Sequence, residues 1–228
     1  MARDKSSRPT GRRATVRVKT ARGRTVSSQR WLQRQLNDPY VAEARRLGYR
    51  SRAAFKLIEL DQRFRLLRPG QRVVDLGCAP GGWTQVSVAR VGRHGIVVGI
   101  DLAATTPLLG ATVLTGDVCD PAIPAVTSEA LGGLADIVLS DMAPAATGHA
   151  ATDHLRIVAL AEDAFAVAAQ ILKPGGAFIA KVFQGGAEGA LLAELKRDFA
   201  ELRHAKPPAS RAESAETYVV ATGYRGGQ

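Results

Sequence analysis

The chain has 228 residues, 46% of them hydrophobic, and a formal net charge of +10. This length suits one α/β domain with a sizeable core, and no apolar run is long enough to predict a membrane span or a secretory leader. Two cysteines without a CxxC pair, and four histidines without metal-ligand spacing to them, exclude a disulfide scaffold and favour a reduced, cytoplasmic protein without a metal site.

The positive charge is concentrated at the start of the chain. Residues 1–30 hold ten Lys or Arg and one acid, Asp4, which leaves 21 basic and 20 acidic residues for 31–228. The polar, basic and aperiodic sequence of 1–26 predicts a disordered arm that contacts phosphate, although a solubilising tail is the alternative. We therefore divide the chain into this arm, one domain over 27–224 and a short tail over 225–228.

After the arm, helical and strand patterns alternate along the chain. Residues 28–48 predict one or two short helices, and Ser51 is placed to cap a helix that runs through Phe64. Lys173-Pro174-Gly175-Gly176 predicts a helix stop before a strand. Strands are predicted over 72–76, 96–101, 111–114, 136–140, 177–183, 202–205 and 218–222, and further helices over 82–91, 125–131, 152–172 and 186–200. This alternation predicts an α/β fold with a mostly parallel sheet covered on both faces.

A glycine-rich turn, DLGCAPGG, follows the first of these strands. Gly77, Gly81 and Gly82 permit positive φ or a close backbone approach. The spacing is not G-x-G-x-x-G, and Pro80 removes one N–H donor, so the turn is a poor pyrophosphate cradle and argues against NAD or FAD. Trp83 comes next and either packs in the core or forms a wall of a cofactor pocket.

Acidic residues end the following strands. Asp101 ends the second strand and Asp117 the third, and together with the acid of the first strand they lie where an open α/β sheet binds ligands. Three carboxylates suit a ligand with a ribose, an adenine and a cationic group but no phosphate, which describes S-adenosylmethionine. Each acid alone could equally cap a turn.

Five separated segments resemble one protein family. They are SRAAFKL (51–57), VVDLGCAPGGWTQ (73–85), LSDMAP (139–144), KVFQG (181–185) and ETYVVATG (216–223), and together they look like the bacterial FtsJ/RrmJ (RlmE) family of 23S ribosomal RNA uridine 2′-O-methyltransferases. The resemblance covers roughly 28–224. It implies a single Rossmann-like class I S-adenosylmethionine-dependent methyltransferase domain, with a seven-stranded, mostly parallel sheet and an antiparallel last strand.

The same resemblance implies a set of site residues and a substrate. Carried over motif by motif, the catalytic residues are Lys56, Asp141, Lys181 and Glu216, and the cofactor contacts are Gly81, Trp83, Asp101, Asp117 and Asp141. The implied substrate is a uridine ribose in the aminoacyl-tRNA-binding loop of 23S rRNA within the 50S subunit. The resemblance implies nothing about the arm.

Lys181 is also unusual without the family. It lies near the end of an apolar strand, where a lysine is costly unless it is paired. Burial and a second cation, Lys56, would both favour its neutral form, which could accept the proton of a ribose 2′-hydroxyl. Asp141 could orient Lys181. Without the family, these residues also have purely structural interpretations: a surface pair of Lys56 with Glu59, a turn cap at Asp141 and a surface acid at position 216.

Other functions remain open at this point. SDMAP lacks the second proline and the aromatic residue typical of base-amine methyltransferases, so an oxygen acceptor is favoured. A tRNA anticodon-loop ribose 2′-O-methyltransferase and a catalytically inactive RNA-binding ribosome assembly factor are the alternatives. The sequence does not determine the oligomeric state, and a monomer is the default expectation.

Overall fold

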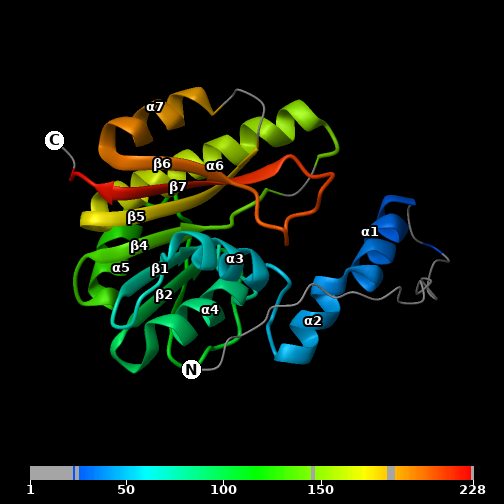
Figure 1. The fold of residues 1–228 in the computed structure, drawn as a ribbon, viewed down its shortest axis with the longest axis horizontal. Helices are drawn as coiled ribbons and strands as arrows, with labels where there is room; N and C mark the ends of the chain where they lie inside the picture. Colours follow the sequence, from blue (N-terminus) through cyan, green and yellow to red (C-terminus); the bar gives the residue numbers. More distant parts are fainter. Residues whose placement is uncertain (1–22, 24–25, 145–146, 184–187, 227–228) are drawn as a thin grey trace.

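A twisted seven-stranded sheet runs through the molecule (Figure 1). The computed structural model describes residues 23, 26–144, 147–183 and 188–226. The strand order is β3-β2-β1-β4-β5-β7-β6, and β7 runs antiparallel to both of its neighbours while the other neighbouring strands pair in parallel. The strands are β1 (Arg72–Leu76), β2 (Ile96–Asp101), β3 (Thr112–Thr115), β4 (Ala135–Ser140), β5 (Leu172–Phe183), β6 (Phe199–Ala205) and β7 (Glu216–Tyr224).

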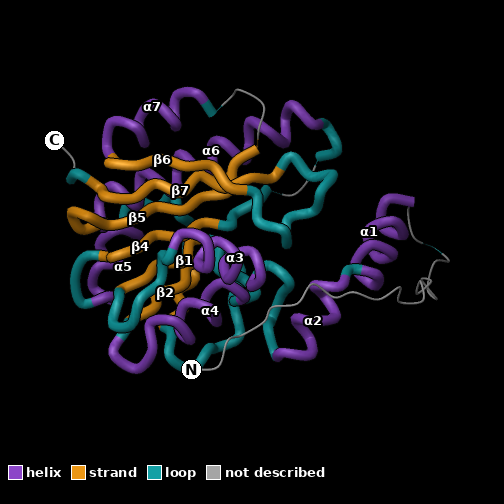
Figure 2. The backbone as a smooth tube through the Cα atoms, in the orientation of Figure 1, coloured by secondary structure: helices purple, strands orange, loops and turns teal. Residues whose placement is uncertain are grey.

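Helices cover both faces of the sheet, as Figure 2 shows. The helices are α1 (Val26–Asn37), α2 (Pro39–Leu47), α3 (Ala54–Phe64), α4 (Gly82–Val91), α5 (Ile123–Leu131), α6 (Ala150–Ile171) and α7 (Gly189–Asp198), with a short 3₁₀ turn at Gly92–His94. One buried apolar cluster joins the sheet to α3 and α4, and the other joins it to α5, α6 and α7. Central strands buried on both faces explain the continuous Val- and Ile-rich runs of β1, β2 and β4. The predicted α/β fold with an antiparallel last strand is confirmed.

Most predicted boundaries are close to the observed ones, and the largest difference is at β5. The helix before it ends at Ile171, as the Lys-Pro-Gly-Gly stop predicts, but the strand begins at once at Leu172 rather than at 177. Leu172 pairs with Ala135 at the start of β4, and an irregular register separates this pair from the regular ladder that begins at Ala177. The segment Lys173-Pro174-Gly175-Gly176, predicted to stop the helix, therefore lies within the irregular first part of β5.

The predicted cap at Ser51 is wrong. Helix α3 begins at Ala54, and its N-cap residue, Ala53, makes no side-chain capping bond. The Ser51 hydroxyl is buried and has no hydrogen-bond partner among the described residues. A Cβ on Gly82 would lie 2.3 Å from Ser51 Oγ, so Ser51 is committed to close packing against the start of α4 instead of capping.

The N-terminal part of the domain forms two helices, as predicted. Asp38 caps α2 by accepting a hydrogen bond from the backbone N–H of Tyr40 at 3.0 Å. Figure 1 shows α1 beyond α2, on the side away from the sheet. Apart from Gly23 and Val26, the arm predicted to be disordered lies outside the described residues, as do the last two residues of the tail. No helix in the described ranges is long and apolar enough to cross a membrane.

Candidate active site

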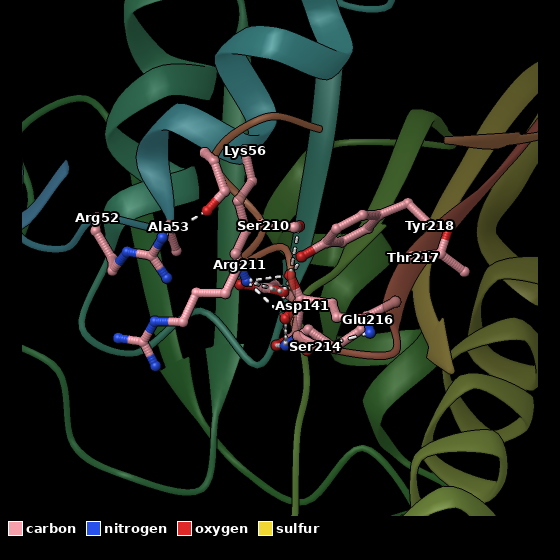
Figure 3. A network of polar contacts seen from close by, with 12 residues as sticks. Arg52, Ala53, Lys56, Asp141, Ser210, Arg211, Ser214, Glu216, Thr217 and Tyr218 are labelled. Atoms are coloured by element: carbon pink, nitrogen blue, oxygen red, sulfur yellow. Dashed lines mark hydrogen bonds and ion pairs between the residues drawn. The ribbon is translucent and has the colours of Figure 1, made fainter. Parts of the chain in front are cut away.

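Four charged side chains from distant parts of the chain meet at the carboxyl edge of the sheet, and Figure 3 labels three of them, Lys56, Asp141 and Glu216. Lys56 comes from α3, Asp141 follows β4, Lys181 lies near the end of β5, and Glu216 begins β7. Because β7 is antiparallel to β5, its first residue pairs with Phe183 at the end of β5 rather than with the opposite edge. All four residues that the sequence predicts to be catalytic are therefore brought together.

The two lysines and two carboxylates form one network, which we call the charge cluster (Lys56, Asp141, Lys181 and Glu216). Lys181 Nζ donates to Asp141 Oδ1 at 2.7 Å and to the Asp141 backbone oxygen at 2.8 Å. Lys56 Nζ lies 2.8 Å from Glu216 Oε1 and 3.6 Å from Asp141 Oδ1. Lys181 Nζ also lies 3.8 Å from Glu216 Oε2, so each ammonium group faces both carboxylates.

The alternative prediction, that Lys56 pairs with Glu59 on an exposed helix face, is wrong. Glu59 accepts hydrogen bonds from the Tyr40 hydroxyl at 3.1 Å and from the Ala209 backbone N–H at 2.6 Å. Lys56 is instead only 7% exposed, as is Lys181. A buried lysine requires a partner, and both lysines have carboxylate partners here.

The electrostatics of the cluster are balanced. Burial alone would raise the pKa of the Asp141 carboxyl, but Lys181 and Lys56 outweigh this and hold that pKa below its ordinary value. Burial likewise acts to raise the pKa of Glu216, and the same two lysines lower it overall. Both carboxylates are thus ionised at neutral pH. The sequence predicts that Lys56, as a second cation, favours the neutral form of Lys181. In the structure, the carboxylates of Asp141 and Glu216 instead lie beside both lysines.

Two further residues of the site escaped the sequence reasoning. The Tyr218 hydroxyl donates to Asp141 Oδ1 at 2.6 Å, and the Ser210 hydroxyl donates to Glu216 Oε1 at 2.6 Å. Burial, followed by the charge of Asp141, raises the pKa of Tyr218 well above its ordinary value, so the phenol stays protonated as a donor. Side chains alternate between the two faces of a strand, so Tyr218 lies on the same face as Glu216, and the sequence could have indicated Tyr218 as a neighbour of the site. Ser210 lies in a loop, where no such period exists.

A cavity of about 660 Å³ adjoins the charge cluster at the carboxyl ends of β1, β2 and β3. Its lining includes Gly77 and Ala79 of the glycine turn and three of the predicted cofactor contacts, Asp101, Asp117 and Asp141, but not Asp75, the acid of the first strand. This is the edge at which open α/β sheets bind ligands. Asp141 therefore belongs both to the cavity wall and to the charge cluster.

The first two of these acids also order their own turns. Asp101 accepts backbone N–H bonds from Ala79 and from Ala103, both at 2.8 Å, and Asp117 accepts one from Cys119 at 3.0 Å. The turn-capping interpretation is thus correct for both. It does not compete with ligand binding, because each carboxylate oxygen has two acceptor sites.

Two of the predicted cofactor contacts lie outside the lining of the cavity. Trp83 is 3% exposed, its indole N–H donates to the Ala53 backbone oxygen at 2.8 Å, and its ring packs on Tyr218. Gly81 has a φ of +109° and lies against the side chain of Arg50. The structure thus places Trp83 in the core, and cofactor contact at Gly81 and Trp83 stays a prediction.

One wall of the cavity comes from α6, which the sequence reasoning did not include in the site. The α6 residues that line it are Arg156, Ala159, Leu160 and Asp163. They are spaced at i, i+3, i+4 and i+7, the spacing of one helix face. This spacing was visible in the sequence, but nothing indicated that the face borders a ligand rather than the core.

The two cysteines and the acids offer no alternative chemistry in this region. Burial raises the pKa of the Cys78 thiol to about 12, which leaves it a poor nucleophile at neutral pH. Among the residues that the structure describes, no group of three or more His, Cys, Asp or Glu side chains is arranged to hold a metal ion.

Comparison with known proteins gives one family. The model of the FtsJ-like methyltransferase family matches residues 49–224. The chain is 61% identical to ribosomal RNA large subunit methyltransferase E of Paramagnetospirillum magneticum, over 98% of this chain and 95% of that one. It is 59% identical to the protein of the same name from Gluconobacter oxydans, over 97% and 82% of the two chains. A crystal structure described as a ribosomal RNA methyltransferase from Plasmodium falciparum superposes with a TM-score of 0.71 at 31% identity, covering 78% of this chain and all of that one.

Asp75 in β1 differs from the acids of the charge cluster, because no cation among the described residues compensates it. It is fully buried, and burial raises the pKa of its carboxyl to about 7. A hydrogen bond from Thr84 Oγ1 at 2.6 Å opposes this rise, and the negative charges of Asp141 and Asp101 add to it.

We predict that Asp75 makes the protein less stable as the pH rises. The folded state holds this proton more tightly than the unfolded chain, so the unfolding free energy falls between about pH 4 and about pH 7. Between about pH 5 and about pH 8, the wild type should lose on the order of 2 kcal/mol more unfolding free energy than Asp75→Asn, because the variant has no carboxyl group to titrate. Urea unfolding at a series of pH values measures this difference. Asp141 and Glu216, with lowered pKa values, lose their contribution only at lower pH.

Asp120→Asn, at an exposed carboxylate, is the control and should leave the pH profile unchanged. An Asp75→Asn profile that parallels the wild type would show that Asp75 does not titrate in this range.

Proposed function

The chain belongs to the FtsJ-like methyltransferase family, and we propose that it transfers a methyl group from S-adenosylmethionine to the ribose 2′-hydroxyl of a uridine in 23S ribosomal RNA. The observation that carries this proposal is the charge cluster, whose two lysines are buried and whose Asp141 also lines a cavity of about 660 Å³. A lysine whose Nζ is held in a fixed direction by Asp141 can serve as the base for a hydroxyl, which is the one proton transfer that ribose methylation needs.

The cavity fits the proposed cofactor in size and in charge. About 660 Å³ is within the range of small-molecule sites. Asp101 and Asp117 supply acceptors for ribose hydroxyls and for an exocyclic amine, and Arg156 on the opposite wall supplies a positive charge for a carboxylate. The turn with Pro80 remains a poor phosphate cradle, which suits a cofactor without phosphate.

When bound, S-adenosylmethionine supplies an electrophilic methyl group on a sulfonium. Lys181 acts as the base at Nζ: in its neutral form it accepts the proton of the 2′-hydroxyl, which leaves the ribose oxygen as the nucleophile. Its hydrogen bonds to the side chain and backbone of Asp141 fix the direction of Nζ. Positioning of this kind is the main contribution that the protein makes to a reaction with little covalent chemistry of its own.

The rest of the cluster holds Lys181 and the substrate in place. Tyr218 fixes the Asp141 carboxylate, and Ser210 fixes that of Glu216. Glu216 in turn holds Lys56, whose ammonium group is available to position the ribose or its phosphate. These bonds join side chains from separate elements of the fold, so the fold itself preorganises the site.

The proposed substrate and location rest on the named relatives and on the low content of aromatic residues. The named relatives are large-subunit ribosomal RNA methyltransferases that span nearly the whole chain. Aromatic residues make up only 5% of the chain, which argues against a broad stacking platform for single strands and favours a preformed particle such as the 50S subunit. We place the enzyme in the cytoplasm, where such particles are assembled. An inactive assembly factor is disfavoured by the complete charge cluster.

We predict that Lys181→Ala abolishes methylation and leaves cofactor affinity largely intact. The assay uses tritiated S-adenosylmethionine with 50S subunits, free 23S rRNA or tRNA from a strain that lacks the endogenous enzyme. Label is expected in an alkali-resistant dinucleotide of 23S rRNA from 50S subunits. Lys173→Ala is the matched control, because Lys173 lies at the other end of β5 and pairs with Asp136.

Activity of Lys181→Ala above about a tenth of wild type would remove Lys181 from the role of base. Label on tRNA alone would keep the chemistry and change the substrate. Normal cofactor binding without label on any RNA would favour the inactive assembly factor.

We predict that Asp117→Asn weakens S-adenosylmethionine binding about tenfold, because the substitution keeps the acceptor for the Cys119 N–H but removes one acceptor for the adenine amine. Asp120→Asn, which has the same kind of turn bond to Ala122 outside the cavity lining, should bind normally. Isothermal titration calorimetry measures both. Equal affinities would refute the adenine contact.

We predict that removing residues 1–25, which leaves α1 in place, weakens RNA binding and flattens the dependence of log K on log salt concentration. Each contact between a phosphate and a Lys or Arg that the deletion removes should make the slope of log K against log salt concentration less steep by about one unit. Filter binding across a salt series measures this, and cofactor affinity serves as the control. A slope that does not change would place the arm away from phosphate.

A further inference from the structure

Arg50, in the segment between α2 and α3, points its guanidinium group at three backbone carbonyls from two separate segments. Nη1 donates to the Thr106 oxygen at 2.7 Å and to the Pro80 oxygen at 3.3 Å. Nη2 donates to the Pro107 oxygen at 2.7 Å. The planar fork of an arginine is suited to such divergent acceptors, and a lysine ammonium is not.

The backbone of Arg50 is itself held on α4. The Arg50 N–H donates to Gln85 Oε1 at 2.7 Å, and Gln85 Nε2 donates to the Gly48 oxygen at 3.0 Å. The Gln85 side chain thus spans the residues on either side of Tyr49. This fixes the point from which the guanidinium reaches across the glycine turn.

The glycine at position 81 makes room for this arginine. A Cβ on Gly81 would lie 2.9 Å from Arg50 Nη1 and 3.1 Å from Arg50 Cδ. Gly81 also has a φ of +109°, where an L side chain is strained. The absence of a side chain at 81 therefore has a physical reason other than contact with a cofactor.

The two segments that Arg50 joins are neighbouring walls of the cavity. Pro80 belongs to the glycine turn, whose Ala79 lines the cavity. Thr106 and Pro107 belong to the connection from β2 to β3, which begins at the lining residue Leu102 and contains no helix or strand. This connection is open to solvent, with Leu109 96% exposed, so apolar burial contributes little to holding it.

We propose that Arg50 is a positioning residue for the nucleoside half of the cofactor, because it clamps the β2–β3 connection to the glycine turn and so sets the spacing between the two walls. This inference rests on the proposed cofactor. Asp101 makes the same join at the base of the walls, through Ala79 and Ala103, and Arg50 makes it farther along the connection.

The geometry favours this role over a contact with RNA phosphate. Two of the carbonyl bonds are 2.7 Å long, and no carboxylate in the described part of the chain pairs with Arg50 to draw the guanidinium elsewhere. An arginine committed to backbone carbonyls has to break those bonds before it can fork onto a phosphate.

The test is Arg50→Lys, which keeps the positive charge but cannot join the two segments. Three quantities are measured: the dissociation constant of S-adenosylmethionine by calorimetry, kcat and the KM of each substrate, and amide hydrogen exchange of residues 102–111 without ligand. We expect about tenfold weaker cofactor binding, an unchanged kcat at saturating cofactor, an unchanged KM for RNA, and faster exchange in 102–111.

Two further variants sharpen the experiment. Arg46→Lys is the matched control and should resemble the wild type, because within the described ranges Arg46 bonds only to Glu43 on its own helix. Gln85→Ala frees the backbone of Arg50 without altering a residue of the cavity lining, and it should give a smaller change of the same kind. It also keeps the proposal testable if Arg50→Lys does not fold.

Cofactor affinity within twofold of the wild type in Arg50→Lys would overturn the proposal. A raised KM for RNA with unchanged cofactor affinity would also overturn it and assign Arg50 to the RNA. If the wild type itself does not bind S-adenosylmethionine, the proposed function fails, and the clamp is then judged on hydrogen exchange alone. Unchanged exchange in 102–111 overturns the clamp in any case.

Discussion

The direction of β7 is the constraint on which the active site depends. In a wholly parallel sheet the first residue of the last strand would lie at the amino edge, far from the ends of β4 and β5. Because β7 runs antiparallel, Glu216 pairs with Phe183 and Tyr218 pairs with Lys181. A register slip of one residue would turn both side chains to the other face of the sheet and dismantle the cluster. The ladder between β5 and β7 therefore assembles the charge cluster as well as the sheet.

Charge balance then decides which acids at this edge are ionised. Asp141, which is half-buried, and Asp75, which is fully buried, lie near the carboxyl ends of neighbouring strands, yet their pKa values shift in opposite directions. Asp141 has two lysines beside it, whereas Asp75 has a threonine hydroxyl and two other acids. A buried charge is stable only with compensation, so removing one member of the cluster leaves a net charge among the other three. Tyr218 and Ser210 add neutral donors that hold the carboxylates without changing this balance.

The parts of this structure that follow from local pattern could be predicted, and the parts that depend on distant contacts could not. The bounds of β1 and β2 agree with the sequence-based ones because both are short apolar runs between clear breakers. Lys56, Asp141 and Glu216 are predicted as site residues only because their motifs resemble a family, whereas Lys181 is also unusual as a lysine within an apolar strand. Ser51 has the residue type of a helix cap, but tertiary packing against Gly82 overrides that preference. The bonds from Arg50 to Thr106 and Pro107 span more than fifty residues, and no periodicity carries that information.

The cavity and the charge cluster are built by different interactions, which lets one change without the other. The walls around Asp101 are held by backbone hydrogen bonds and by the guanidinium of Arg50, so their spacing depends on the loops. The cluster is held by ion pairs between side chains on rigid elements. Among the described residues, Asp141 is the only cluster member that also lines the cavity. In the proposed reaction the methyl donor and the ribose oxygen approach to about 3 Å, and Asp141, as the shared residue, fixes the charge cluster next to the cavity that we propose for the methyl donor.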